Sequence, residues 1–87
     1  MKHSSTLNNP RNKLFKVEEW RAPFFLTLSK VFGKNRVASV NRLPEFWMNS
    51  TKVCWFTHET GFYIRGDAMA DFLMNFDVAG LNITEME

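Results

Sequence analysis

Residues 52–65 read KVCWFTHETGFYIR, and this stretch decides the fold. In its first half the side chains alternate between two faces, one carrying Trp55 and the other Phe56. A second apolar run, Phe62-Tyr63-Ile64, follows a connector that ends in Gly61, a residue able to take a positive φ. Two alternating runs joined by so short a connector predict a β-hairpin over 52–65.

A helical pattern follows the hairpin directly. As on the buried stripe of an amphipathic helix, four apolar side chains recur at i, i+3, i+4 and i+7: Met69, Phe72, Leu73 and Phe76. Asp67 stands where a side chain caps the first turn. Gly80 stands where a left-handed residue follows the last turn. A helix is therefore predicted to begin at Gly66-Asp67 and to end at Gly80.

An earlier helix is predicted over residues 18–32. Its apolar stripe consists of Phe24, Phe25, Leu28, Val31 and Phe32. Pro23 suits the first helical position, where its missing N–H is not needed. Gly33 suits the residue that follows the last turn.

Weaker patterns complete the predicted domain. Residues 36–42 have strand character, 13–17 predict a short strand that joins the sheet, and 44–48 predict one helical turn. The whole is an α+β domain over residues 13–87, with two helices packed on a small, mostly antiparallel sheet of three or four strands. A winged-helix arrangement is the alternative, but it needs a third helix, for which only 44–48 is available. Residues 1–12 are polar and are predicted to be a disordered arm that folding does not require.

The cysteine count and the lengths of the apolar runs indicate in which cellular compartment the protein is expected. The chain has 87 residues and a single cysteine, Cys54, so it cannot form an internal disulfide. No long apolar run follows Lys2, and no apolar stretch approaches the ~20 residues that span a bilayer. We therefore expect a cytoplasmic protein that does not enter a membrane.

No catalytic, cofactor or metal site is predicted. Cys54 and His58 share a strand face, but four strand positions separate them by roughly 13 Å. A nucleophile and its base need about 3 Å. With His3, these two residues are too few for structural zinc, which takes four ligands. Arg65-Gly66-Asp67 spells an adhesion tripeptide, yet its position favours a strand end, a turn and a helix cap.

Charge is distributed unevenly along the chain. Residues 1–52 hold ten Lys and Arg against three acidic residues, whereas residues 53–87 hold one against six. Basic residues interleaved with aromatic ones suit a nucleic acid, whose phosphates pair with cations and whose bases stack on rings. The residues predicted for such an interface are Lys13, Lys16, Arg21, Lys34, Arg36 and Arg42.

The segment 43–48, LPEFWM, is a second candidate surface. Its three large apolar residues lie between a proline and a polar loop, and Trp and Met are typical anchors of protein interfaces. Phe46, Trp47 and Met48 are therefore predicted to contact a protein partner. The alternative is that Phe46 and Trp47 close one end of the core.

These patterns favour a non-enzymatic binding or regulatory protein that contacts and occludes a larger protein, and they leave a homodimer open. Many small proteins of this kind are encoded by phages and mobile elements, so an inhibitor from such a source is the specific form of the hypothesis. The alternative function is a DNA- or RNA-binding module, winged-helix-like, that uses the basic first half of the chain.

Overall fold

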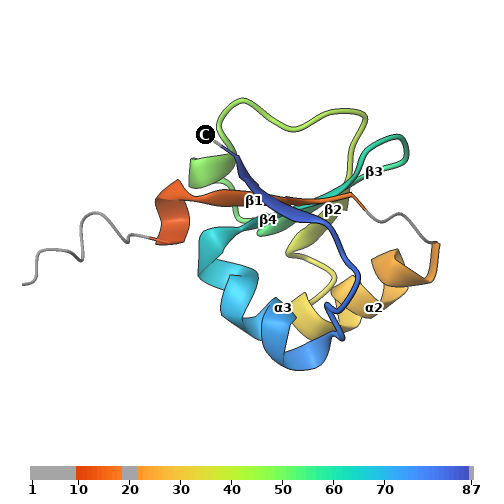
Figure 1. Ribbon diagram of the computed structural model, residues 1–87. Coiled ribbons are helices and arrows are strands. Elements are labelled where there is room, and N and C mark those ends of the chain that lie inside the picture. Colours follow the sequence, from red (N-terminus) through yellow and green to blue (C-terminus); the bar gives the residue numbers. More distant parts are fainter. Residues whose placement is uncertain (1–9, 19–21, 87) are drawn as a thin grey trace, which may run out of the picture.

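The computed structural model describes residues 10–18 and 22–86, and the remaining residues, Arg21 and His3 among them, lie outside the described part. Helices and strands alternate irregularly along the chain (Figure 1). Their order is η1 (Pro10–Asn12), β1 (Leu14–Val17), α2 (Ala22–Phe32), β2 (Val37–Ser39), η2 (Trp47–Asn49), β3 (Cys54–Thr57), β4 (Gly61–Arg65), η3 (Gly66–Ala68), α3 (Met69–Asn75) and β5 (Ile83–Met86).

The strands form one mixed sheet in the order β2-β3-β4-β1-β5. β2 is parallel to β3, and every other neighbouring pair is antiparallel. Two helices on a mostly antiparallel sheet confirm the predicted α+β class. The sheet has one strand more than expected, because residues 83–86 pair with β1. The alternative winged-helix arrangement is wrong, since the turn expected at 44–48 is only the 3-10 turn η2 within a long loop.

The predicted hairpin is present as β3 and β4. Its turn, residues 58–60, is closed by Gly61, which has φ 104° and pairs with Thr57. A Cβ at this glycine would lie 2.1 Å from the backbone oxygen of Val17. Both the positive φ and the close approach of β1 therefore require glycine here.

Both predicted helices are present but shorter than expected. α2 ends before Gly33 (φ 95°), as predicted, and begins at Ala22 rather than at residue 18. α3 ends at Asn75, because Phe76 is already extended with φ −127° and ψ 143°. Gly80 (φ 84°) lies in the turn before β5 and does not end the helix.

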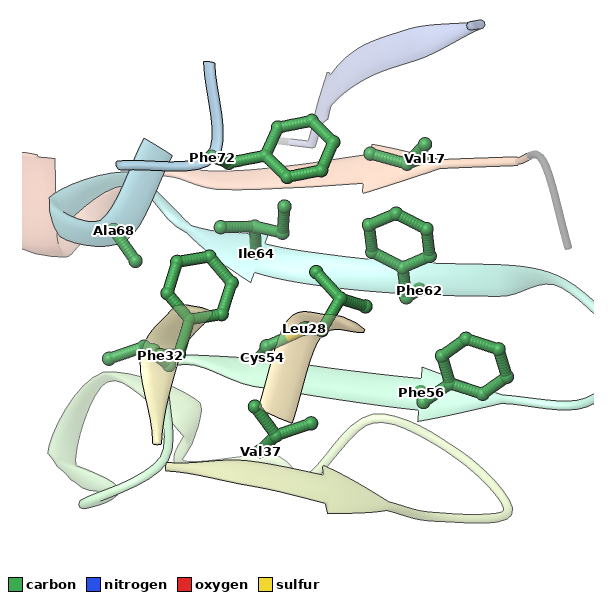
Figure 2. Packing of buried hydrophobic residues seen from close by; sticks show 11 residues of the cluster. Val17, Leu28, Phe32, Val37, Cys54, Phe56, Phe62, Ile64, Ala68 and Phe72 are labelled. Carbon is green, nitrogen blue, oxygen red and sulfur yellow. The ribbon is translucent and has the colours of Figure 1, made fainter. Parts of the chain in front are cut away.

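The core lies between the sheet and the two helices (Figure 1). We call this side of the sheet the helix face. Phe62 is at its centre, with ring centroids 5.8 Å from Phe24, 5.9 Å from Phe56 and 5.8 Å from Phe72. Figure 2 shows Phe56 and Phe62 side by side on neighbouring strands, with the ring of Phe72 next to Val17. Aromatic rings thus supply much of the apolar area that this small domain buries.

The opposite side, which we call the loop face, is covered differently. Because β2 and β3 are parallel, the chain must return along the sheet between them, and residues 40–53 do so on the side away from the helices (Figure 1). Trp55 points to this side by alternation with Cys54 and Phe56, and it is only 1% exposed. The returning loop therefore covers Trp55.

Candidate functional site

The predicted partner-binding segment lies on the returning loop. Phe46 directly precedes η2, and Trp47 and Met48 begin it. The side chain of Phe46 is 75% exposed and that of Met48 is 41% exposed, whereas Trp47 is half-buried. Phe46 therefore does not close the core, and two of the three predicted anchors present apolar surface to solvent.

One buried side chain holds this part of the loop. Arg65 ends β4, lies on the loop face beside its pairing partner Leu14, and is 2% exposed. Its Nη1 donates to three backbone oxygens of the loop, those of Trp47 at 3.3 Å, Met48 at 3.4 Å and Ser50 at 2.9 Å. Three bonds from one rigid guanidinium define the path of the backbone on both sides of Met48.

The charge of Arg65 is balanced by Asp67. The Nε and Nη2 atoms of Arg65 donate to the two carboxylate oxygens at 2.8 and 2.9 Å. This hydrogen bonding lowers the pKa of Asp67. The prediction that Asp67 caps the following helix is wrong, since neither η3 nor α3 has a side-chain cap. A two-pronged bond to a charged group is stronger than a cap, so the carboxylate turns back to Arg65.

The same network excludes the adhesion reading of Arg65-Gly66-Asp67. An adhesion motif must present its arginine to a receptor, but Arg65 is buried beneath the loop. The tripeptide instead joins β4 to η3 and anchors the loop.

Residues 10–12 also contact the site. Arg11 Nε donates to the backbone oxygen of Met48 at 2.9 Å, and its Nη1 lies 3.8 Å from the carboxylate of Asp67. Gly66 N donates to Lys13 O at 2.8 Å. A Cβ at Gly66 would meet the backbone oxygen of Pro10 at 2.3 Å. Of the predicted arm, residues 1–9 lie outside the described part, and residues 10–12 form η1 against the folded domain.

The five described residues among the six predicted to contact nucleic acid are spread over both ends of the sheet and its loop face. Lys13 pairs with Glu85 at 3.8 Å, and Lys16 is half-buried on the loop face of β1. Exposed Lys34 and Arg36 precede β2, whereas exposed Arg42 follows it at the other end of the sheet. Arg21 lies outside the described residues.

A cation that the sequence did not single out joins Lys34 and Arg36. Lys52 Nζ donates to the backbone oxygen of Asn35 at 2.7 Å. We call Lys34, Arg36 and Lys52 the basic cluster. Lys52 is distant in sequence from Lys34 and Arg36, and the parallel pairing of β2 with β3 brings it beside them.

Cys54 and His58 do not form a catalytic pair. Cys54 is fully buried on the helix face, and this burial raises the pKa of its thiol. His58 is exposed in the hairpin turn. In the part of the chain that the structure describes, no three His, Cys, Asp or Glu residues are grouped as metal ligands. None of the described helices is long and apolar enough to cross a bilayer.

No protein-family model, curated protein or solved structure matches this chain. The candidate site is therefore defined by geometry alone: exposed Phe46 and Met48 on a loop held by Arg65, next to the basic cluster.

Proposed function

We propose that this protein is a non-enzymatic binding protein that contacts and occludes a larger protein through Phe46, Trp47 and Met48. The observation that supports the proposal most directly is the 75% exposure of Phe46 on a loop whose neighbouring carbonyls are held by Arg65. Large aromatic side chains dominate binding energy at protein interfaces. An inhibitor of phage or mobile-element origin is the specific form of this proposal.

The held loop matters because flexible loops lose conformational freedom when they bind. Arg65 and Arg11 both donate to the backbone oxygen of Met48, so the segment is ordered before any partner arrives. A pre-ordered surface retains more of its contact energy as affinity. Phe46 and Met48 therefore present apolar area at a low entropic cost.

The test compares Phe46→Ala with Leu26→Ala. Leu26 is 66% exposed on α2 and serves as a matched control, because it removes exposed apolar area away from the loop. Wild-type protein and both variants are immobilised, source-cell proteins are captured, and the dissociation constant of the captured partner is measured.

Phe46→Ala should weaken binding by roughly 2 kcal/mol, about 30-fold, as at interface hot spots. Leu26→Ala should leave the dissociation constant unchanged, and both variants should melt close to the wild type. Wild-type affinity in both Phe46→Ala and Met48→Ala would exclude this surface.

The basic cluster supports a second candidate function, binding of DNA or RNA. Lys34, Arg36 and Lys52 are adjacent cations that could pair with phosphates. In that case Arg36→Ala should weaken binding and reduce the slope of affinity against salt concentration by about one unit. Phe46→Ala should then matter only if a base stacks on its ring.

A further inference from the structure

We infer that the partner presents an acidic segment that carries a large apolar side chain. This inference rests on the proposed function and specifies the chemistry of the partner. Phe46 and Met48 would receive the apolar side chain, and the basic cluster would pair with carboxylates beside it.

Strand register places the basic cluster and the anchoring arginine at the same end of the sheet. Val53 N donates to Arg36 O at 2.8 Å, and Arg65 N donates to Val53 O at 2.8 Å. Arg65 in turn pairs with Leu14. Arg36, Val53, Arg65 and Leu14 therefore form one row across the sheet, at the end where β1, β2 and β3 begin.

A chain of hydrogen bonds joins the basic cluster to the apolar loop. Lys52 Nζ is bonded to Asn35 O, and Lys52 N donates to Ser50 Oγ at 3.0 Å. Ser50 N donates to Trp47 O at 3.2 Å, and Trp47 lies between Phe46 and Met48 in the chain. The apolar and basic parts therefore belong to one ordered surface.

The cations at this end differ in their availability. Arg11 and Lys13 lie 3.8 Å from the carboxylates of Asp67 and Glu85. Among the described residues, none of the basic cluster makes an ion pair with a carboxylate. These cations thus retain positive potential, which attracts carboxylates and accelerates encounter with an acidic partner.

The arrangement favours a protein segment over a nucleic acid. A phosphate backbone needs cations that continue along its track. Here the basic cluster lies on one side of the apolar pair, while Arg11 and Lys13 lie near acidic side chains. Phe46 carries a ring on which a base could stack, but Met48 beside it does not, and the flexible thioether of Met48 suits an apolar protein side chain.

The test uses random twelve-residue peptides displayed on phage and selected against the full chain. Strongly selected peptides are synthesised, and their dissociation constants are measured by fluorescence anisotropy at low and high salt. Each is tested on the wild type, on Phe46→Ala, on Lys34→Glu/Arg36→Glu and on Arg42→Glu. Arg42→Glu is the control for position, because Arg42 is an exposed arginine at the opposite end of the sheet; it reverses one charge and the double variant reverses two.

The selected peptides should combine Asp or Glu with an aromatic or aliphatic side chain. Their dissociation constants should rise at least about tenfold in Phe46→Ala and in Lys34→Glu/Arg36→Glu, and less than about twofold in Arg42→Glu. High salt should weaken binding to the wild type more than binding to Lys34→Glu/Arg36→Glu.

Four outcomes would overturn the inference. If the selected peptides are not enriched in Asp or Glu but still require Phe46, the partner is not acidic, and the proposed function stands. Peptides unaffected by Phe46→Ala, or the absence of any peptide binding below about 1 mM, would contradict both. Tighter binding of a twenty-residue oligothymidine, with a steep dependence on salt, would favour the nucleic-acid function instead.

Discussion

The two faces of the sheet are covered by different physical means. The helix face is covered by apolar side chains from α2 and α3, and its central ring, Phe62, contacts three other aromatic rings. The loop face is covered by residues 40–53, which one buried guanidinium holds through backbone oxygens. Apolar packing spreads stability over many side chains, whereas the loop is held by a few hydrogen bonds, three of them from Arg65 and one from Arg11.

Because of this difference, the helix face buries its apolar side chains, whereas the loop face exposes two of its own. A loop held by hydrogen bonds to its carbonyls can leave its side chains exposed, as Phe46 and Met48 are. A helix held by its side chains must bury them, as α3 buries Phe72. The comparison teaches that the loop can leave Phe46 and Met48 exposed because hydrogen bonds to its backbone oxygens, rather than these two side chains, hold it.

The largest effect is expected on the helix face. Phe72→Ala should lower the free energy of unfolding by about 3–5 kcal/mol, the range for emptying a buried phenylalanine. Phe72 is fully buried against Phe62 and Phe76. Urea unfolding measures the change, and neighbouring Leu73→Ala is the control because Leu73 is half exposed. Equal losses in the two variants would show that α3 is not packed as described.

Arg65→Met should lower the free energy of unfolding somewhat less, by about 2–4 kcal/mol. It leaves the carboxylate of Asp67 and three backbone oxygens of the loop without their hydrogen-bond donor. The side chain of Asp67 is 25% exposed, so water can solvate part of its charge. Amide hydrogen exchange should show lost protection in residues 47–53, while α3 stays protected. An equal loss of amide protection in residues 47–53 and in α3 would show that the two faces do not unfold independently.

Gly66→Ala should cost about 1–3 kcal/mol through overpacking, since its Cβ would press on the backbone oxygen of Pro10. In a chain lacking residues 1–12 this cost should fall, because the contacts with Pro10 O at 2.3 Å and Pro10 C at 3.1 Å are then removed. Gly33→Ala is the control, since its cost arises from a positive φ in open space. Thermal melts of the wild type, Gly66→Ala, the chain lacking residues 1–12 and the combined variant measure the coupling between Gly66 and residues 1–12. A Gly66→Ala cost unchanged by the deletion would show that η1 does not dock.

The smallest expected effect is the pH dependence that Asp67 contributes. Its pKa is lower in the folded protein than in the unfolded chain, chiefly through the Arg65 hydrogen bonds. Its contribution is therefore present above the unfolded value of about 4 and is lost as pH falls through the folded value. Urea midpoints of the wild type and Asp67→Asn should differ most near neutrality and converge in acid. A difference in urea midpoint that grows in acid would show that the pKa of Asp67 is raised, not lowered, in the folded protein.

Local pattern was sufficient to predict most of the helix face. The alternation in 52–65 predicted β3 and β4, and the spacing of Met69, Phe72, Leu73 and Phe76 predicted α3, because these signals arise within one element. Of that stripe, Leu73 is half exposed and Phe76 lies just past the end of α3. Strand β5 was missed because Ile83–Met86 buries little and carries no strong alternation. Phe46 and Met48 were identified from composition, but their exposure depends on the path of the loop.

The sequence by itself determined the class of fold, the position of the hairpin and the apolar stripes, since each follows from the period of side chains along a few residues. Only the tertiary structure decided what Arg65 and Lys52 do. Arg65 reads as the polar end of a strand, yet it is buried because a loop from a distant part of the chain supplies its acceptors. Lys52 joins Lys34 and Arg36 because β2 and β3 are parallel neighbours. Partners distant in sequence carry no local period, so such contacts exist only once the chain has folded.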